Sequence, residues 1–246
     1  MNRKTIVRGV LIALVLVFSG LSGATRPPDG EPSREVQGRV TMTFADSNRT
    51  LKDASNVVVW LTPLGATAGL QNISEAHKYQ MAQRNKSFQP GILVVPIGTE
   101  VDFPNYDPWF HNVFSLYQGK RFDLGLYEAG SRKQVLFDRP GPSFIFCNIH
   151  PQMHAVVMVV DSNYFGISNK VGKFSISGVP AGRYELHVWY EQAAPKALEA
   201  FDREVVIDEG SRTLPAINLA ALEQDPAKHR NKYGEDYDPK DQAPTY

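Results

Sequence analysis

The sequence predicts an all-β protein made of two β-sandwiches. Short runs rich in β-branched and aromatic residues recur along the chain, separated by Gly, Pro, Asn and Asp, which is typical of strands joined by turns. Apolar residues almost never repeat with the period of a helix. With 246 residues, 42% of them apolar, the chain can bury a sizeable core, and its length suits one large β domain or two small ones.

Strands are expected where apolar and polar residues alternate, or where a short apolar run is bounded by turn residues. In the first half of the chain these are residues 36–44, 56–61, 77–85, 92–95 and 99–103, with 64–76 as a loop. In the second half they are 122–127, 133–137, 143–146, 155–160, 173–176, 183–190 and 203–207, and a helix is considered only at 193–200. Residues 221–246 are charged, contain Pro and have few aliphatic side chains, which predicts a disordered or loosely docked tail.

The first 24 residues have the pattern of a secretory signal peptide. Three basic residues and no acidic one precede the apolar run at 10–18, and Ser22 and Ala24 stand where a signal peptidase cuts. The run is short for a membrane span, which needs about 20 residues, so membrane association is expected only if the segment stays uncleaved as an anchor. We therefore expect a periplasmic or secreted protein.

Charge and cysteine content exclude several classes of protein. The chain has 26 basic and 26 acidic residues, and without the signal segment it is slightly acidic, which argues against a nucleic-acid binder. Cys147 is the only cysteine, which excludes a disulfide within the chain. Exported proteins usually pair their cysteines or lack them, so a single one is a buried bystander, an intermolecular bridge, a ligand or a nucleophile.

Residues 144–160 read FIFCNIHPQMHAVVMVV and contain the strongest chemical signal. Cys147, His150 and Met153 follow the spacing C-x2-H-x2-M between two apolar strands, so they share one tight loop. His111 precedes a short strand upstream and can face that loop across the sandwich. A thiolate, two imidazoles and a thioether suit a copper ion that cycles between Cu(II) and Cu(I). A rigid β scaffold that keeps one geometry for both states favours electron transfer over substrate turnover.

Each candidate taken alone has an ordinary alternative. A single cysteine on a strand is often a small core residue, a histidine a surface residue, and a methionine part of the packing. Zinc is less suitable than copper, because zinc sites seldom recruit Met and usually contain more Cys, His or carboxylate ligands. His154, next to Met153, is an alternative ligand. The remaining histidines are expected on an edge strand, on a sheet surface and in the tail (His77, His187 and His229).

These motifs resemble the cupredoxins, the small blue-copper proteins of the plastocyanin and amicyanin type. The expected domain covers residues 77–160. His111-Asn112-Val113 matches the surroundings of the family's first histidine ligand, and the C-x2-H-x2-M spacing matches its short ligand loop. The family's opening strands are matched at Phe88, Gln89, Pro90, Val95, Gly98, Val101, Phe103 and Asn105.

The resemblance implies a Greek-key domain that holds one type 1 copper ion. By resemblance, His111, Cys147 and His150 bind the copper, Met153 is its axial ligand, and Asn112 ties the two ligand loops together through contacts that tune the ligands. The protein would then carry single electrons to and from a redox partner that binds weakly and transiently.

The chain departs from the family's pattern at Trp109 and Phe110, which are inserted before His111, and in the long stretch 116–138 between the ligand loops. These departures affect the surface that docks a partner rather than the copper site. Ordinary sandwich packing explains the two aromatic residues equally well. The functional interpretation is an apolar rim for a redox partner, since electron-transfer encounters need only small interfaces.

A second module surrounds the first in the sequence. Residues 172–189 read GKFSISGVPAGRYELHVW and resemble the carboxypeptidase regulatory, transthyretin-like β-sandwich, and 203–207 and 213–219 resemble its last strands. Gly38-Arg39-Val40 and residues 53–57 fit the opening of that family. We therefore predict one discontinuous transthyretin-like or immunoglobulin-like sandwich from 34–70 and 161–220, with the copper domain inserted. Its function cannot be read from the sequence; the candidates are carbohydrate or cell-surface attachment, or a spacer that presents the copper site.

Three functions from different classes follow. The first is an exported electron carrier with one type 1 copper. The second is a periplasmic protein that stores or delivers copper, and the third is a structural or adhesion module in which Cys147 is merely buried. An enzyme is not expected, because copper oxidases need further His-rich clusters and the chain has six His, no Ser-His-Asp arrangement and no phosphate-binding glycine loop.

Overall fold

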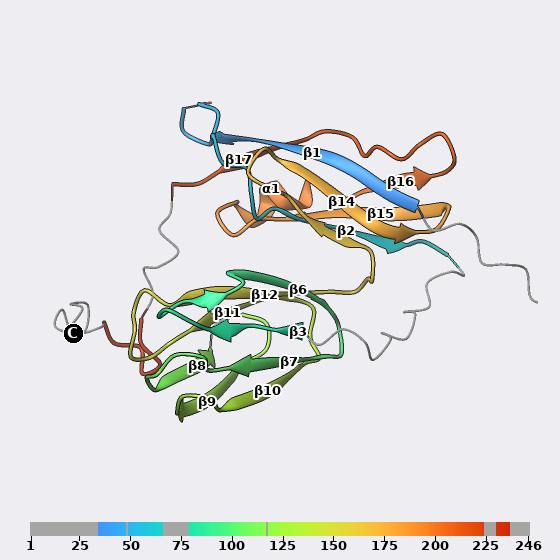
Figure 1. Cartoon of the computed structure of the whole chain (residues 1–246). Coiled ribbons are helices and arrows are strands. Elements are labelled where there is room, and N and C mark those ends of the chain that lie inside the picture. Colours follow the sequence, from blue (N-terminus) through green and yellow to red (C-terminus); the bar gives the residue numbers. More distant parts are fainter. Residues whose placement is uncertain (1–33, 48, 66–78, 117, 224–229, 237–246) are drawn as a thin grey trace, which may run out of the picture. The chain divides into compact units, whose positions relative to one another are not determined.

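The computed structural model describes residues 34–47, 49–65, 79–116, 118–223 and 230–236 (Figure 1). The expected signal peptide, most of the loop at 64–76, His77 and His229 therefore lie outside the described residues. Within the described ranges, α1 (Pro195–Glu199) is the only helix, and no helix there is long and apolar enough to cross a membrane.

The middle of the chain forms a sandwich of two sheets. One has five strands in the order β6-β12-β11-β8-β9, and the other has three in the order β10-β7-β3, with the small pair β4-β5 beside them. The strands are β3 (Tyr79–Gln80), β4 (Ala82–Gln83), β5 (Phe88–Gln89), β6 (Ile92–Pro96), β7 (Thr99–Pro104), β8 (His111–Ser115), β9 (Phe122–Tyr127), β10 (Arg132–Phe137), β11 (Gly141–Phe146) and β12 (His154–Val160).

Strand pairing in the five-stranded sheet brings distant segments together. β12 is buried on both faces, which explains why its sequence is a continuous apolar run. β11 pairs antiparallel with β12 from Gly141 opposite Val159 to Phe146 opposite His154. β11 also pairs antiparallel with β8, with Phe146 opposite Phe114. The residues that follow β11 therefore run back along the beginning of β8, where His111 lies.

The segments that flank this sandwich share one core. In Figure 1, β1, in blue, lies beside the orange strand β14 and beside β17. The two sheets have the orders β14-β1-β17 and β13-β2-β15-β16. Their strands are β1 (Arg34–Phe44), β2 (Val58–Pro63), β13 (Phe165–Ile167), β14 (Lys173–Val179), β15 (Gly182–Trp189), β16 (Arg203–Ile207) and β17 (Ile217–Ala221).

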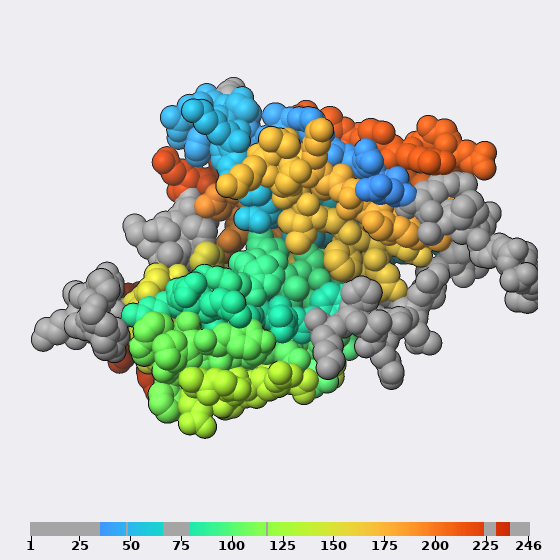
Figure 2. Space-filling view, viewed as in Figure 1, coloured from blue at the N-terminus to red at the C-terminus, as the bar shows by residue number. Residues whose placement is uncertain are grey.

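The core of these flanking segments contains residues from both ends of the chain. Val36, Val40 and Met42 of β1 pack in one cluster with Leu186 of β15 and Ile217 of β17, and all five are at most 2% exposed. In Figure 2 the blue atoms of the first segment and the orange atoms of the second accordingly form one mixed surface. The domain limits 34–70, 161–220 and 77–160 remain our proposal.

The glycine in the Gly-x-Val opening has a packing reason. Gly38 pairs with Phe174 of β14, and a Cβ atom on Gly38 would collide with the Phe174 ring. Only glycine lets the tip of the Phe174 ring come this close to β1. This contact joins the first strand of the chain to a strand 136 positions later.

A third apolar cluster lies between the sheets that contain β2 and β12. Val58, Val94, Met158 and Val160 are each at most 3% exposed and pack together with partly buried neighbours such as Trp189. Successive side chains of β12 therefore face two different cores in turn, and Ala155, Val157 and Val159 face the core of the first sandwich.

The all-β sandwich class is confirmed, but several details differ from the sequence predictions. The expected strand at 77–85 is two short strands, β3 and β4, and α1 spans five residues instead of eight. The short strands β5 and β13 were not predicted from the pattern, because two or three residues show no alternation; the residues of β5, Phe88 and Gln89, were matched to an opening strand only by resemblance. Ala221, assigned to the tail, lies in β17, pairs with Phe44 and is 1% exposed. His111 is the first residue of β8 and does not merely precede it.

Candidate metal centre

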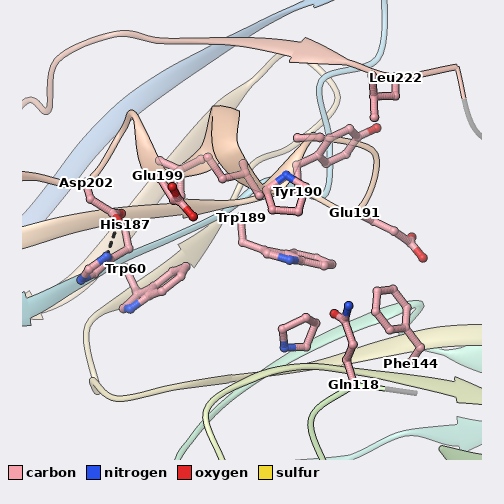
Figure 3. A pocket seen from close by; sticks show the side chains of 15 residues that line it. Trp60, Gln118, Phe144, His187, Trp189, Tyr190, Glu191, Glu199, Asp202 and Leu222 are labelled. Atoms are coloured by element: carbon pink, nitrogen blue, oxygen red, sulfur yellow. Dashed lines mark hydrogen bonds and ion pairs between the residues drawn. The ribbon is translucent and has the colours of Figure 1, made fainter. Parts of the chain in front are cut away.

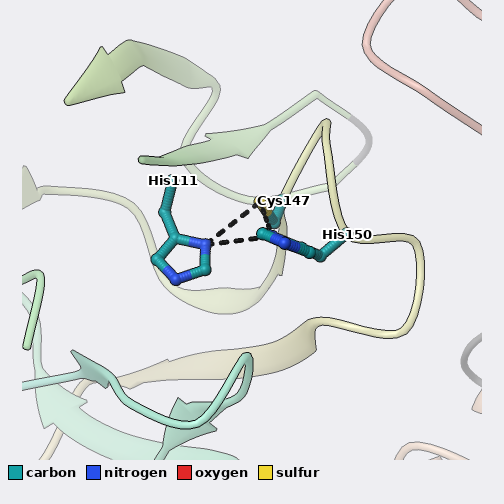
Figure 4. A group of neighbouring side chains, drawn as sticks. All are labelled: His111, Cys147 and His150. Atoms are coloured by element: carbon teal, nitrogen blue, oxygen red, sulfur yellow. Dashed lines mark hydrogen bonds between the residues drawn. The ribbon is translucent and has the colours of Figure 1, made fainter. Parts of the chain in front are cut away.

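Three predicted ligands meet at one point of the first sandwich. The Nδ1 atoms of His111 and His150 are 3.1 Å apart, and the Sγ atom of Cys147 lies 3.9 Å and 3.8 Å from them. Figure 4 shows the two rings and the sulfur turned toward one another. His111 opens β8, and Cys147 directly follows β11. The structure thus brings together residues that are up to 39 positions apart in the sequence.

Backbone hydrogen bonds close the loop that holds two of these residues. The Met153 amide donates to the His150 carbonyl at 2.9 Å, and the Cys147 amide donates to the Met153 carbonyl at 3.3 Å. Met153 is fully buried in the same core cluster as Cys147. The loop therefore has a fixed shape, because it is anchored at its end by a core side chain and by strand β12.

The sulfur of Cys147 lies in an apolar environment that still provides hydrogen-bond donors. Burial raises the pKa of the Cys147 thiol, and the backbone amides of Asn112, Ile149 and His150 oppose this by donating to the sulfur. Without a cation nearby, the thiol therefore keeps its proton at neutral pH. A bound cation together with three amide donors can stabilise the thiolate.

Both imidazoles are neutral at neutral pH. Burial lowers the pKa of His111 despite the adjacent carboxylate of Asp107, and burial together with His111 lowers the pKa of His150 to about 4. His111 Nε2 lies 2.8 Å from Asp107 Oδ2. This nitrogen therefore carries the ring proton and donates a hydrogen bond to the carboxylate. The Nδ1 atom of His111 then carries a lone pair, which faces His150 Nδ1 and Cys147 Sγ.

Asp107 contacts the site but was not singled out in the sequence analysis. It is 3% exposed, and its two oxygens accept hydrogen bonds from the backbone amides of Asn85 (2.6 Å) and Lys86 (2.9 Å) as well as from His111. Burial acts to raise the pKa of Asp107, but these donors outweigh burial and lower it. Asn85 and Lys86 have φ of 54° and 52°, a conformation in which successive amides point at one anion.

The geometry of the three atoms fits a metal ion. A point equidistant from them lies about 2.1 Å from each, and bonds from a first-row ion such as Zn²⁺ to imidazole nitrogen and thiolate sulfur are about 2.0 to 2.3 Å long. The donor set of two neutral nitrogens and one sulfur is that of a transition-metal site rather than of a Ca²⁺ or Mg²⁺ site, which takes oxygen ligands.

Asn112 contacts the ligand loop through its backbone. Its amide donates to the Cys147 sulfur, while its side-chain Nδ2 donates to Asp123 Oδ1 at 2.8 Å. Its Oδ1 atom is buried and has no hydrogen-bond partner. His154, the alternative ligand, is not part of the three-residue group, and its Nε2 lies 3.4 Å from Glu191 Oε1.

Aromatic side chains lie at the surface immediately before β8. Trp109 and Phe110 are 38% and 56% exposed, and Ile149 of the ligand loop is 37% exposed. The Lys86 ammonium lies 5.0 Å from the centre of the Trp109 ring, and Asn105 Nδ2 donates to the Trp109 carbonyl at 2.7 Å. These contacts hold Trp109 in place, and both aromatic residues remain open to solvent.

A separate cavity of about 490 Å³ contains none of the three ligand candidates. It is lined by residues of β2, β11, β15 and α1, among them Trp60, Phe144 and Trp189 (Figure 3). His187, expected on a sheet surface, lines this cavity: its ring stacks on Trp60 at 4.9 Å, and its Nδ1 atom pairs with Asp202 at 2.9 Å.

Comparisons with known proteins find similarity over part of the chain. No family model and no curated protein matches. Among solved structures, a purple cupredoxin from Nitrosopumilus maritimus is 25% identical over 34% of this chain and all of its own (TM-score 0.32). The copper-containing nitrite reductase of Thermus scotoductus SA-01 is 28% identical over 40% of this chain and 25% of its own (TM-score 0.34). A reduced amicyanin variant is 17% identical over 42% of this chain and 98% of its own (TM-score 0.33).

Proposed function

We propose that this protein binds one copper ion through His111, Cys147 and His150 and carries single electrons between redox partners. One observation supports this above all others: two neutral imidazole nitrogens and one thiol sulfur converge within 3.9 Å of one another. They do so on two anchored elements, the first residue of β8 and a loop closed by its own backbone hydrogen bonds.

The donor set favours copper over zinc. A thiolate stabilises Cu(I), imidazole binds both Cu(I) and Cu(II), and a trigonal site with a weak axial Met is the arrangement of blue-copper proteins. We propose Met153 as that axial ligand, which makes the site type 1. A structural zinc site would need a fourth strong nitrogen, sulfur or carboxylate ligand.

The chain's own residues define what the site does. Copper, when bound, would supply the Cu(II)/Cu(I) redox couple, which exchanges one electron. Asp107 fixes the tautomer and orientation of His111, and the Asn112, Ile149 and His150 amides spread the negative charge of the Cys147 sulfur. The buried core around Cys147 and Met153 keeps water away from the sulfur. Little has to move when an electron arrives, which favours transfer without bond making.

A reversible redox cycle tests this function against the alternatives. Purified protein is loaded with Cu(II), reduced with ascorbate and reoxidised while its visible absorption is recorded. An electron carrier returns to the same spectrum with its copper retained. A storage or delivery protein loses copper quickly to a chelator and gives no well-behaved couple. A structural module takes up no stoichiometric copper.

The broader setting of the site is also a proposal. We propose that the protein is exported through its N-terminal segment and that the flanking sandwich, of the carboxypeptidase regulatory type, presents the copper site. Location of the protein in periplasmic or culture fractions, with residues 1–24 absent by mass spectrometry, tests the export.

Trp109→Ala is expected to slow electron self-exchange between reduced and oxidised copies about 5- to 10-fold, because a partly exposed aromatic anchor beside the site is lost. The visible spectrum should not change, since Trp109 is not a ligand. NMR line broadening in mixtures of the two states measures the rate. Val206→Ala, an exposed apolar residue of β16, is the matched control. An unchanged rate in Trp109→Ala contradicts the docking role of Trp109 and Phe110.

A further inference from the structure

The charged segment near the end of the chain is docked beside the ligand loop. Residues 230–236, the red segment near β8 in Figure 1, form a turn that contacts the first sandwich through Lys232. The Lys232 amide donates to Asn148 Oδ1 at 3.0 Å, and its ammonium lies 2.9 Å from Asp123 Oδ2. Asn148 is the residue directly after Cys147.

The second of these contacts is connected to the Cys147 sulfur through two residues, Asp123 and Asn112. Asp123 accepts from Lys232 with one oxygen and from Asn112 Nδ2 with the other. The Asn112 amide in turn donates to Cys147. Lys232 is therefore linked to both sides of Cys147, to β8 through Asp123 and Asn112 and to the ligand loop through Asn148.

The segment itself has a defined shape. Asn231 Oδ1 accepts from the Tyr233 amide at 2.9 Å and from the Glu235 amide at 3.0 Å. Gly234, with φ of 84°, donates to the Asn231 carbonyl at 3.0 Å. This turn presents Lys232 in one orientation. The hydrogen bond to Asp123 raises the pKa of Lys232, so Lys232 is charged at neutral pH.

We propose that residues 230–236 are a clamp that holds the ligand loop 147–153 closed, with the Lys232–Asp123 ion pair as its main contact. Cys147 is fully buried, so its sulfur reacts with solvent or with a chelator only when this loop opens. A contact that stabilises the closed loop lowers the rate of those reactions. An effect of the clamp on copper exchange rests on the proposed function. Its effect on the opening of the loop does not, because the loop can open in metal-free protein.

The single cysteine provides a direct readout in metal-free protein. Alkylation by iodoacetamide, followed by mass spectrometry, modifies Cys147 and no other thiol. We expect Lys232→Met to increase the alkylation rate about 3-fold, because a partly exposed ion pair contributes modestly. Arg230→Met is the matched control: it removes the same charge from the same segment, where Arg230 faces the exposed Asp236 at 3.7 Å. Its rate should equal that of the unmodified chain.

Salt gives a second test that needs no variant. Iodoacetamide is uncharged, so its encounter with the protein does not depend on ionic strength. Salt screens the Lys232–Asp123 pair, and alkylation should therefore be faster in 1 M NaCl than in 0.05 M NaCl. Equal rates for Lys232→Met, Arg230→Met and the unmodified chain, or a rate independent of salt, would overturn the clamp.

Copper loss distinguishes this inference from the proposed function. In the copper-loaded protein, Lys232→Met should speed transfer of Cu(I) to bathocuproine disulfonate by a similar factor. If the protein binds no copper, the proposed function fails, and the alkylation rates still decide whether the clamp exists.

Discussion

Cys147→Ser is expected to remove the strong visible absorption of the copper-loaded protein and to lower its copper affinity by more than about 100-fold. Loss of a partner outside the ligand shell already costs about 10- to 100-fold in comparable metal sites, and under the proposed function a ligand itself is lost. The visible band arises from charge transfer from sulfur to Cu(II), and serine has no sulfur. Its hydroxyl also does not ionise readily enough to replace a thiolate. Absorption spectra and competition with a chelator measure both effects.

The substitution is nearly isosteric, so the fold should persist. Met158→Leu is a matched control, because it removes another buried sulfur, 3% exposed, from a different apolar cluster. Its spectrum and copper affinity should equal those of the unmodified chain. Retention of an intense visible band in Cys147→Ser would show that the sulfur is not a ligand.

Asp107→Ala is expected to lower the free energy of unfolding of the metal-free protein by about 3 kcal/mol. The change leaves the buried Nε2–H of His111 and the part-buried amides of Asn85 and Lys86 without their acceptor, and an unsatisfied buried donor costs about 1 to 3 kcal/mol. Copper affinity should also fall about 10- to 100-fold, because His111 loses the partner that orients it. Urea unfolding and chelator competition measure the two effects.

Two variants show whether burial or charge causes this loss. Asp107→Asn keeps an acceptor oxygen and should recover part of the stability. Asp138→Ala removes a carboxylate of an exposed pair with Lys120 and should lower the free energy of unfolding much less than Asp107→Ala does. A loss of stability in Asp107→Ala no larger than that in Asp138→Ala would contradict the anchoring role.

The loss in Asp107→Ala should also depend on pH. The pKa of Asp107 is lower in the folded protein than in the unfolded chain. The contribution of Asp107 to the free energy of unfolding is therefore complete above its pKa in the unfolded chain. It disappears as the pH falls through its pKa in the folded protein. The stability difference between Asp107→Ala and the unmodified chain should be largest near pH 7 and should shrink in acid.

The local part of the site could be predicted from the sequence, but its support could not. Cys147, His150 and Met153 lie within seven residues between two apolar strands, so their loop follows from spacing alone. His111 was a candidate from its place before a strand that can face the loop, and the resemblance of its surroundings supported this assignment. Asp107 stands four residues before His111, a spacing that was visible, but its importance depends on amides more than 20 residues away.

The fold was predictable where alternation or apolar runs were long. β1 and β12 were predicted because their patterns extend over seven or more residues. β13 has three residues and pairs with β2 through tertiary contacts that no local pattern reveals. Composition predicted a loosely docked tail at 221–246. It could not show that Lys232 meets Asp123, because this pair spans 109 positions.

X-ray absorption at the copper edge, recorded on protein loaded with one equivalent of copper, tests the central claim most directly. The proposal predicts saturation at one copper per chain, with one sulfur and two imidazole nitrogens bound at short distances, and loss of the short sulfur contact in Cys147→Ser. A copper environment of nitrogen and oxygen alone, or one that is the same in Cys147→Ser, would contradict it.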